Sequence, residues 1–236
     1  VGPELKRLPG LTSTVRKSGL TMAPEVATDR LREVIRKPIK NADLMAGCEA
    51  AYQAGYRLVK FYFLIGAPTE TDEDLRGIVD LANQASALRI RTHGRRAQVN
   101  CSVSSHIPKP HTPFQWEAMD TREELIAKQR YIRNYNRSSQ IQLKFHDVNT
   151  SYLESVFSRG DRRLADTLLK AREAGLRMDA WSECFDIRRW DEVFRDAGVD
   201  PDFYALRARS TDEILPWDMI GLKIPTSHLA KEHARA

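Results

Sequence analysis

Apolar and polar positions alternate in a regular way along the first 146 residues, where short apolar runs are separated by longer segments of helical periodicity. Gly19 to Val26 (GLTMAPEV) and Leu58 to Ile65 (LVKFYFLI) are predominantly apolar. Residues 98–104 (QVNCSVS) and 141–146 (IQLKFH) alternate apolar with polar side chains, as in strands with one wetter face. The pattern predicts four strands.

The intervals between these strands predict helices with recognisable starts. Thr28–Asp29, Asn41, Thr71 and Thr121 are expected to cap them, because side chains of these types accept hydrogen bonds from free N–H groups at a helix start. The helix after Thr71 has an acidic first turn and a predicted buried face of Leu75, Ile78, Val79, Ala82, Ala85 and Leu88. Strands alternating with helices predict a parallel sheet with right-handed crossovers.

The stretch RLVKFYFLIGAPTET, residues 57–71, has the strongest signal for a ligand site. An apolar strand runs into Gly66, then Pro68, then a helix start. In parallel α/β sheets, the loops at the carboxyl ends of the strands form the binding face. We therefore expect Gly66 to Glu70 to lie on that face.

The segment HIPKPHTPFQW, residues 106–116, follows the third predicted strand and contains three prolines. Proline excludes it from a helix or a central strand, so we expect an exposed, stiffened loop. His106, Lys109 and His111 could contact an anionic substrate there or, less readily, a metal. The alternative is that all three are solvated loop residues.

From Asp147 onward the pattern favours helices at residues 152–157, 161–174 and 186–197, followed by irregular chain anchored by aromatic residues. Residues 1–146 are therefore expected to form the α/β domain, and residues 147–236 a mainly helical extension. A three- or four-stranded sheet alone would expose an apolar edge, so further strands are expected upstream. Residues 1–18 are interpreted as a lead-in from a longer chain.

Composition and charge limit the cellular compartment and the binding partners that we expect for this protein. The 236 residues are 42% hydrophobic, with a net charge of +5 and a pI near 9.2, which is compatible with nucleic acid and also with an ordinary mixed-charge surface. No apolar run approaches the roughly 18 residues of a membrane span, and no signal peptide is apparent, so we expect a cytoplasmic protein without a membrane partner. Cys48, Cys101 and Cys184 lack disulfide or metal spacing and are expected to be buried or half-buried.

Two basic clusters and one histidine pair are weaker candidates. The clusters Arg91 to Arg96, within the predicted basic loop RIRTHGRR (residues 89–96), and Arg159 to Arg163 could meet RNA phosphates, although no aromatic residues are interleaved with these charges. His146–Asp147 resembles a base with an orienting carboxylate. Adjacent strand residues point to opposite faces, however, which disfavours direct pairing.

Three segments together resemble one family. GLTMAPEVATDRLREVIRK, FYFLIGAPTETDEDL and VNCSVSSHIPKPHTPFQW are similar to the fourth, fifth and sixth strand segments of radical S-adenosylmethionine (SAM) enzymes. Gly66, Pro68 and Glu70 match the family's Gly-x-Pro-x-Glu turn. GDRRL, AWSECFD and LPWD resemble the C-terminal extension of the branch in which the barrel follows a cobalamin-binding-type domain.

The resemblance implies the C-terminal half of a partial (βα)6 TIM-type barrel that binds SAM beside a [4Fe-4S] cluster. Glu25 would contact the SAM ribose or amino acid portion. The backbone around Ile65 and Gly66 would contact the adenine, with Pro68 and Glu70 completing the turn. Ordinary alternatives are a capping carboxylate at Glu25, plain turn chemistry at Gly66 and Pro68, and helix-dipole compensation at Glu70.

The chain departs from the family at the cluster, because no Cys-x3-Cys-x2-Cys motif occurs. We therefore expect the C-terminal portion of a longer enzyme, inactive alone, whose partner is the missing barrel half. Cobalamin use and the substrate, which could be RNA, are left open. The alternative is a non-catalytic α/β binding module, possibly RNA-binding.

Overall fold

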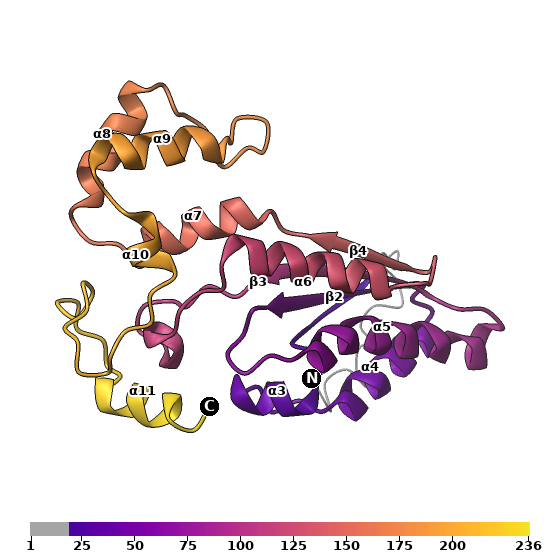
Figure 1. Ribbon diagram of the computed structural model, residues 1–236. Helices are drawn as coiled ribbons and strands as arrows, with labels where there is room; N and C mark the ends of the chain where they lie inside the picture. The colour runs from indigo at the N-terminus through magenta and orange to yellow at the C-terminus, as the bar shows by residue number, and fades with distance from the viewer. Residues whose placement is uncertain (1–18) are drawn as a thin grey trace. The chain divides into compact units, whose positions relative to one another are not determined.

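The computed structural model describes residues 19–236 and contains a four-stranded parallel sheet (Figure 1). Its strands are β1 (Leu20–Glu25), β2 (Leu58–Ile65), β3 (Gln98–Ser105) and β4 (Ile141–Phe145). The order in the sheet is β1-β2-β3-β4, and all three pairings are parallel. The predicted α/β class and parallel sheet are therefore confirmed.

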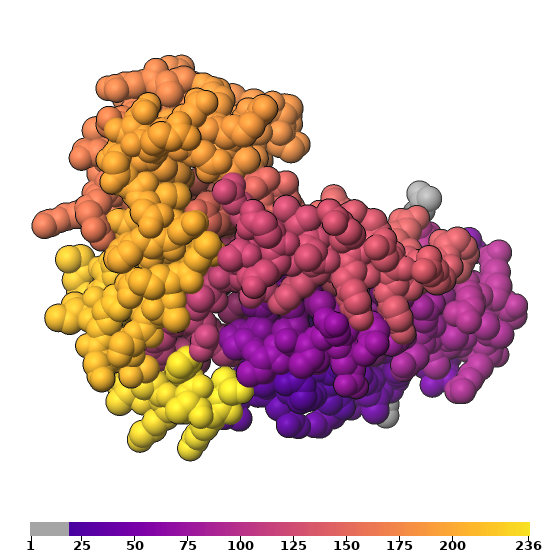
Figure 2. Space-filling view, viewed as in Figure 1, coloured from indigo at the N-terminus to yellow at the C-terminus, as the bar shows by residue number. Residues whose placement is uncertain are grey.

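Helices connect successive strands, as the alternating pattern predicts. α3 (Asp29–Val34) and α4 (Asn41–Gln53) join β1 to β2, α5 (Asp72–His93) joins β2 to β3, and α6 (Arg122–Tyr135) precedes β4. In the space-filling view, the side chains of α4, α5 and α6 form a continuous surface that hides most of the strands (Figure 2). No helix within residues 19–236 has the length and apolar character that a membrane span requires.

The two faces of the sheet differ in burial. Alternate residues of β2 and β3 are at most 1% exposed, because they face the helices; these are Val59, Phe61, Phe63, Ile65, Val99, Cys101 and Val103. The intervening positions carry Leu58, Lys60, Tyr62 and Leu64 on β2 and Gln98, Asn100, Ser102 and Ser104 on β3, and Tyr62 is 45% exposed. The apolar core therefore lies on one side of the sheet, and the other face is polar on β3 and mixed on β2.

Two of the predicted helix caps are confirmed, and two other predictions are corrected. Thr28 and Thr71 are the N-caps of α3 and α5. The N-cap of α4 is Lys40, and Asn41 is the first helical residue. Residues 89–93 were predicted as part of a basic loop, but α5 continues to His93 and ends at Gly94, whose φ of 70° suits a left-handed helix terminus.

The described chain divides into two compact units. The first contains residues 19–105 and 124–146, with the whole sheet. The second contains residues 106–123 and 147–235, so the proline-rich segment groups with the helical extension. Its helices are α7 (Val148–Ser158), α8 (Leu164–Glu173), α9 (Ile187–Ala197), α10 (Pro201–Ala205) and α11 (Thr226–His233).

The helical character predicted for the extension is confirmed, and the end of the chain is more regular than expected. α10 and α11 lie in the part predicted as irregular chain. The predicted aromatic anchoring is present, because Trp116, Trp217, Leu215 and Leu229 form one buried cluster within this unit.

Candidate functional site

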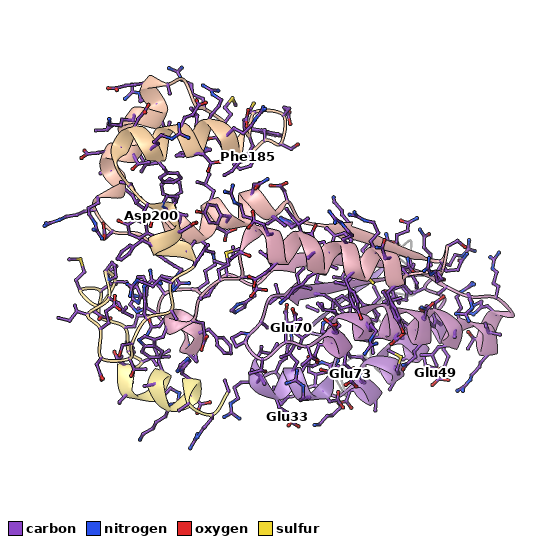
Figure 3. The ribbon with its side chains drawn as sticks, viewed as in Figure 1. Glu33, Glu49, Glu70, Glu73, Phe185 and Asp200 are labelled. Carbon is purple, nitrogen blue, oxygen red and sulfur yellow. The ribbon has the colours of Figure 1, made fainter. Side chains whose placement is uncertain are left out.

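The carboxyl ends of the strands form one edge of the first unit. Because the strands are parallel, their last residues come to the same side, and Ile65 pairs directly with Ser105. Glu25 is the last residue of β1 and pairs with Phe63. Figure 3 shows Glu70 in the loop that follows β2 at this edge. The predicted cofactor-binding residues Glu25, Ile65, Gly66, Pro68 and Glu70 all lie at the ends of β1 and β2 or in the loop after β2.

Three residues at this edge have a left-handed backbone. Glu25, Gly66 and Thr69 have φ angles of 66°, 83° and 64°. Glycine adopts this conformation freely, whereas in glutamate and threonine it is strained. Strained backbone of this kind is found more often at functional sites. The register of β1 against β2 also shifts between Met22 and Glu25, an irregularity that redirects side chains.

The buried carboxylate of Glu70 stabilises the turn after β2. Its Oε1 accepts a 2.9 Å hydrogen bond from the Gly66 N–H and a 2.8 Å ion pair from Lys128 Nζ of α6. The Glu70 side chain is only 3% exposed. The carboxylate therefore closes the turn and attaches it to α6.

Asp74 joins the loop after β1 to the loop after β2. Its carboxylate accepts hydrogen bonds from the Thr28 hydroxyl and from the N–H and hydroxyl of Thr71, and it forms an ion pair with Arg30. Arg30 also donates to the Thr69 carbonyl at 2.9 Å. Burial opposes ionisation of Asp74, but the hydrogen bonds from Thr28, Thr71 and Arg30 outweigh it, so its pKa lies below the usual value.

Glu25 has a free oxygen at the end of β1. Its Oε1 pairs with Lys37 Nζ at 2.8 Å, and the two side chains are 32% and 26% exposed, respectively. Oε2 has no hydrogen-bond partner among the described residues. A ligand at this edge could therefore donate to Oε2 without displacing the ion pair.

The rest of the turn after β2 becomes more exposed as it leaves the sheet. Ile65, Gly66 and Ala67 are buried, Pro68 is half-buried and Thr69 is exposed. A ligand contact at Ile65 would have to use its backbone, because its side chain is 0% exposed and lies on the helix-facing side.

The predicted substrate loop belongs to the second unit and differs from the expectation. None of residues 106–116 is exposed, and Pro113–Trp116 forms a 3-10 helix in which Gln115 and Trp116 are buried. The segment is packed, from half-buried to buried, so the prediction that it is exposed was wrong. Gln115 Oε1 accepts from the His111 N–H at 3.0 Å and from Trp217 Nε1 at 2.7 Å.

The cationic candidates in this loop are constrained. Burial lowers the pKa of His106 to about 4, its ring packs edge-on against Phe114, and its Nδ1 has no partner among the described residues. Lys109 forms an ion pair with Glu154 at 2.5 Å. His111 has a left-handed φ of 57°. A neutral His106 and a paired Lys109 make this segment a weak anion site.

The cysteines provide no metal site within residues 19–236, where no cluster of metal-binding side chains occurs. Burial raises the pKa of both Cys48 and Cys101 to about 12. These two are buried, as expected. Cys184 is exposed, so its predicted burial was wrong.

Several of the weaker candidates have structural roles. Arg159 is buried and donates to the carbonyls of Ala205 and Arg207, and Arg163 pairs with Asp161 at 2.6 Å. Asp147 is the N-cap of α7 and accepts from the Thr150 N–H. Arg159, Arg163 and Asp147 are thus committed to contacts of their own, whereas Arg162 and His146 are exposed.

Comparison with known proteins gives a relative without a described activity. No family model matches the chain. The uncharacterized protein MJ0966 of Methanocaldococcus jannaschii is 32% identical over 189 residues, which are 80% of this chain and 40% of that protein. The matched region thus spans about two fifths of the length of that relative.

Proposed function

We propose that this chain is the SAM-binding part of a radical SAM enzyme, with Glu25 and the turn at Gly66 contacting SAM. The single observation that carries the proposal is the arrangement of the strand ends. Glu25 with its unpartnered Oε2 and the left-handed Gly66 turn lie at the ends of paired neighbouring strands, at the ligand-binding edge of a parallel sheet.

The strand order supports a barrel over a doubly wound sheet. In β1-β2-β3-β4 each strand pairs with its successor, and the order never reverses. With right-handed crossovers, all connecting helices then lie on one face, and the other face becomes the inside of a curved sheet. A doubly wound sheet would instead reverse its order and carry helices on both faces.

The residues at the edge fit SAM in two respects. The Glu25 carboxylate can accept from a ribose hydroxyl or from the amino group, because its Oε2 has no partner among the described residues. Gly66 allows the backbone to turn sharply beneath a flat base, while Glu70 and Lys128 hold the turn in place. SAM bound next to a reduced [4Fe-4S] cluster would supply the 5′-deoxyadenosyl radical.

Residues outside these 236 would hold the cluster in this proposal. Cys48 and Cys101 are buried thiols with raised pKa values, which disfavours the thiolate needed for ligation. Cys184 stands alone and exposed in the second unit. The relative from Methanocaldococcus jannaschii is longer than the matched region and has room for such ligands.

The test is calorimetric titration of the chain with SAM, comparing Glu25→Gln with Glu33→Gln. Glu33 is a matched control because it also pairs with a lysine at 2.8 Å but lies on α3. We expect saturable binding that Glu25→Gln weakens about fivefold. This corresponds to the difference of ~1 kcal/mol between hydrogen bonds to charged and to neutral acceptors.

Two outcomes would count against the proposal. The wild-type chain, verified as folded by circular dichroism, could fail to bind SAM, which would favour a non-catalytic binding module. Alternatively, Glu25→Gln and Glu33→Gln could bind SAM equally well, which would remove Glu25 from the site.

A further inference from the structure

The sheet face turned away from the helices carries a cationic and polar surface. Lys60, Asn100 and Gln142 are neighbours across β2, β3 and β4, and one pleat further on Tyr62, Ser102 and Lys144 are neighbours in the same way. We call these six residues the inner-face cluster. They lie on rigid strands of one compact unit, so their mutual positions are fixed by the sheet.

The charge on this face is uncompensated. Lys60 and Lys144 form no ion pair or hydrogen bond with any residue in the described part of the chain. Neither Asp nor Glu occurs at the inward positions of β2, β3 and β4, which run from Leu58, Gln98 and Gln142 at every second residue. Two lysines without counter-charges, beside a serine and a tyrosine hydroxyl, form a site for an anion.

The cluster also contains groups that suit a planar heterocycle. Tyr62 is 45% exposed although it lies on a central strand, and an exposed ring can stack on a base. The Oδ1 of Asn100 is buried without a hydrogen-bond partner within residues 19–236. A buried acceptor of this kind is costly unless a ligand donates to it.

We propose that the inner-face cluster binds the substrate and that this substrate is a nucleoside phosphate. The phosphate lies between Lys60 and Lys144, the base stacks on Tyr62, and Asn100 accepts from a base or ribose donor. The assignment as substrate rests on the proposed SAM function, because both ligands would then share the interior of one barrel. Binding of the nucleotide itself does not depend on it.

The cluster favours a single nucleotide over a nucleic acid strand. It has one aromatic ring, and Lys60 and Lys144 stand on strands two spacings apart, about 10 Å. Binding a strand without sequence preference usually requires a row of aromatic residues and an extended basic groove. The proposal is therefore a mononucleotide.

The test titrates the whole chain with uridine 5′-monophosphate, whose base does not occur in SAM, and with guanosine 5′-monophosphate as a purine. We expect binding of at least one with a Kd below about 1 mM. K60Q/K144Q should weaken binding about tenfold or more through lost charged contacts, and Tyr62→Leu about fivefold through lost stacking. Uridine without phosphate should bind more weakly than its monophosphate.

Matched controls are Lys40→Gln, an exposed lysine that pairs with Glu33, and Tyr135→Leu, a 40% exposed tyrosine on α6. Both should bind nucleotide like the wild type, and circular dichroism establishes that each variant is folded. The inference would be overturned if neither mononucleotide bound. It would also be overturned if K60Q/K144Q and Lys40→Gln bound the nucleotide equally well. Binding of a ten-nucleotide RNA without binding of mononucleotides would overturn it as well.

A parallel SAM titration of the wild type separates the two proposals. SAM binding without nucleotide binding overturns only this inference. Nucleotide binding without SAM binding overturns the proposed function and leaves the inner-face cluster as a nucleotide site.

Discussion

At the scale of single residues, the strand-end loops depend on two carboxylates that are each held by specific hydrogen-bond and ion-pair partners. Glu70 receives the Gly66 N–H and the Lys128 ammonium, and Asp74 receives Thr28, Thr71 and Arg30. Neither carboxylate points freely into solvent. The candidate site is therefore held by polar contacts beneath it as well as by the apolar core.

Asp74→Asn should lower the free energy of unfolding by roughly 1–3 kcal/mol, because a buried charged hydrogen-bond acceptor loses its charge while Arg30 and Thr71 stay in place. The stabilisation of the wild type by Asp74 is present above the unfolded pKa of 3.8 and is lost as the pH falls through the lower folded pKa. Urea melts at pH 7 and pH 3 measure both effects. Asp72→Asn, at the exposed first position of α5, is the control; an equal loss in both variants would contradict the assignment.

His106 predicts a second pH dependence. The unfolded chain binds a proton at this residue below pH 6.5, whereas the folded imidazole stays neutral down to about pH 4 because it is buried. The stabilisation of the fold by the neutral imidazole of His106 is therefore complete above pH 6.5 and falls as the pH is lowered toward 4. Thermal melts of wild type and His106→Gln should converge over this window; a constant difference between them would refute the assignment.

At the scale of elements, the turn after β2 places a glycine with a left-handed backbone at the proposed ligand site. Gly66 and Gly94 have φ angles of 83° and 70°. Gly94 lies at the end of α5 with nothing within 4 Å of the position of an added Cβ. The two glycines thus share the conformational requirement but differ in their proximity to the proposed ligand.

Gly66→Ala and Gly94→Ala should each cost about 1 kcal/mol of stability, because alanine resists positive φ. Gly66→Ala alone should also weaken SAM binding, which calorimetry on both folded variants would measure. A similar affinity for SAM in the two variants would remove the turn from the ligand site.

Sequence reasoning was most successful where local patterns decide the structure. The strands at Leu58–Ile65 and Gln98–Ser105 and the caps at Thr28 and Thr71 follow from periodicity and capping chemistry. The packing of residues 106–116 could not be predicted, because it depends on contacts with residues about a hundred positions away, such as Gln115 with Trp217. The Asp74 contacts were missed for the same reason, since Thr28 and Arg30, at the start of α3, are 46 and 44 positions away in the sequence.

The inner-face cluster illustrates a further limit. Lys60 interrupts the apolar run of β2, and the sequence marks it only as an interruption. Its neighbours become known only from the register, which pairs Lys60 with Asn100 and, on the next strand, Asn100 with Gln142. A one-residue change of register would turn these side chains to the other face, so the cluster requires the three-dimensional pairing.

At the scale of the whole molecule, the sheet has two edges within the described residues, β1 and β4. Edge strands of a parallel sheet present unpaired backbone groups that can pair with another copy. We expect the 236-residue chain alone to self-associate, and light scattering coupled to size-exclusion chromatography measures this. A monomer at all accessible concentrations, with one cooperative thermal transition, would contradict the expectation that further strands complete the sheet.

The most direct measurement of the central claim is the formation of 5′-deoxyadenosine from SAM. A longer protein that contains this chain would be reconstituted anaerobically with iron and sulfide, reduced with dithionite and supplied with SAM, and the product would be quantified by chromatography. We predict 5′-deoxyadenosine from the longer protein, a reduced amount from its Glu25→Gln variant, and none from the 236-residue chain, which lacks a Cys-x3-Cys-x2-Cys motif. A reconstituted longer protein with iron–sulfur absorbance that leaves SAM intact would contradict the account.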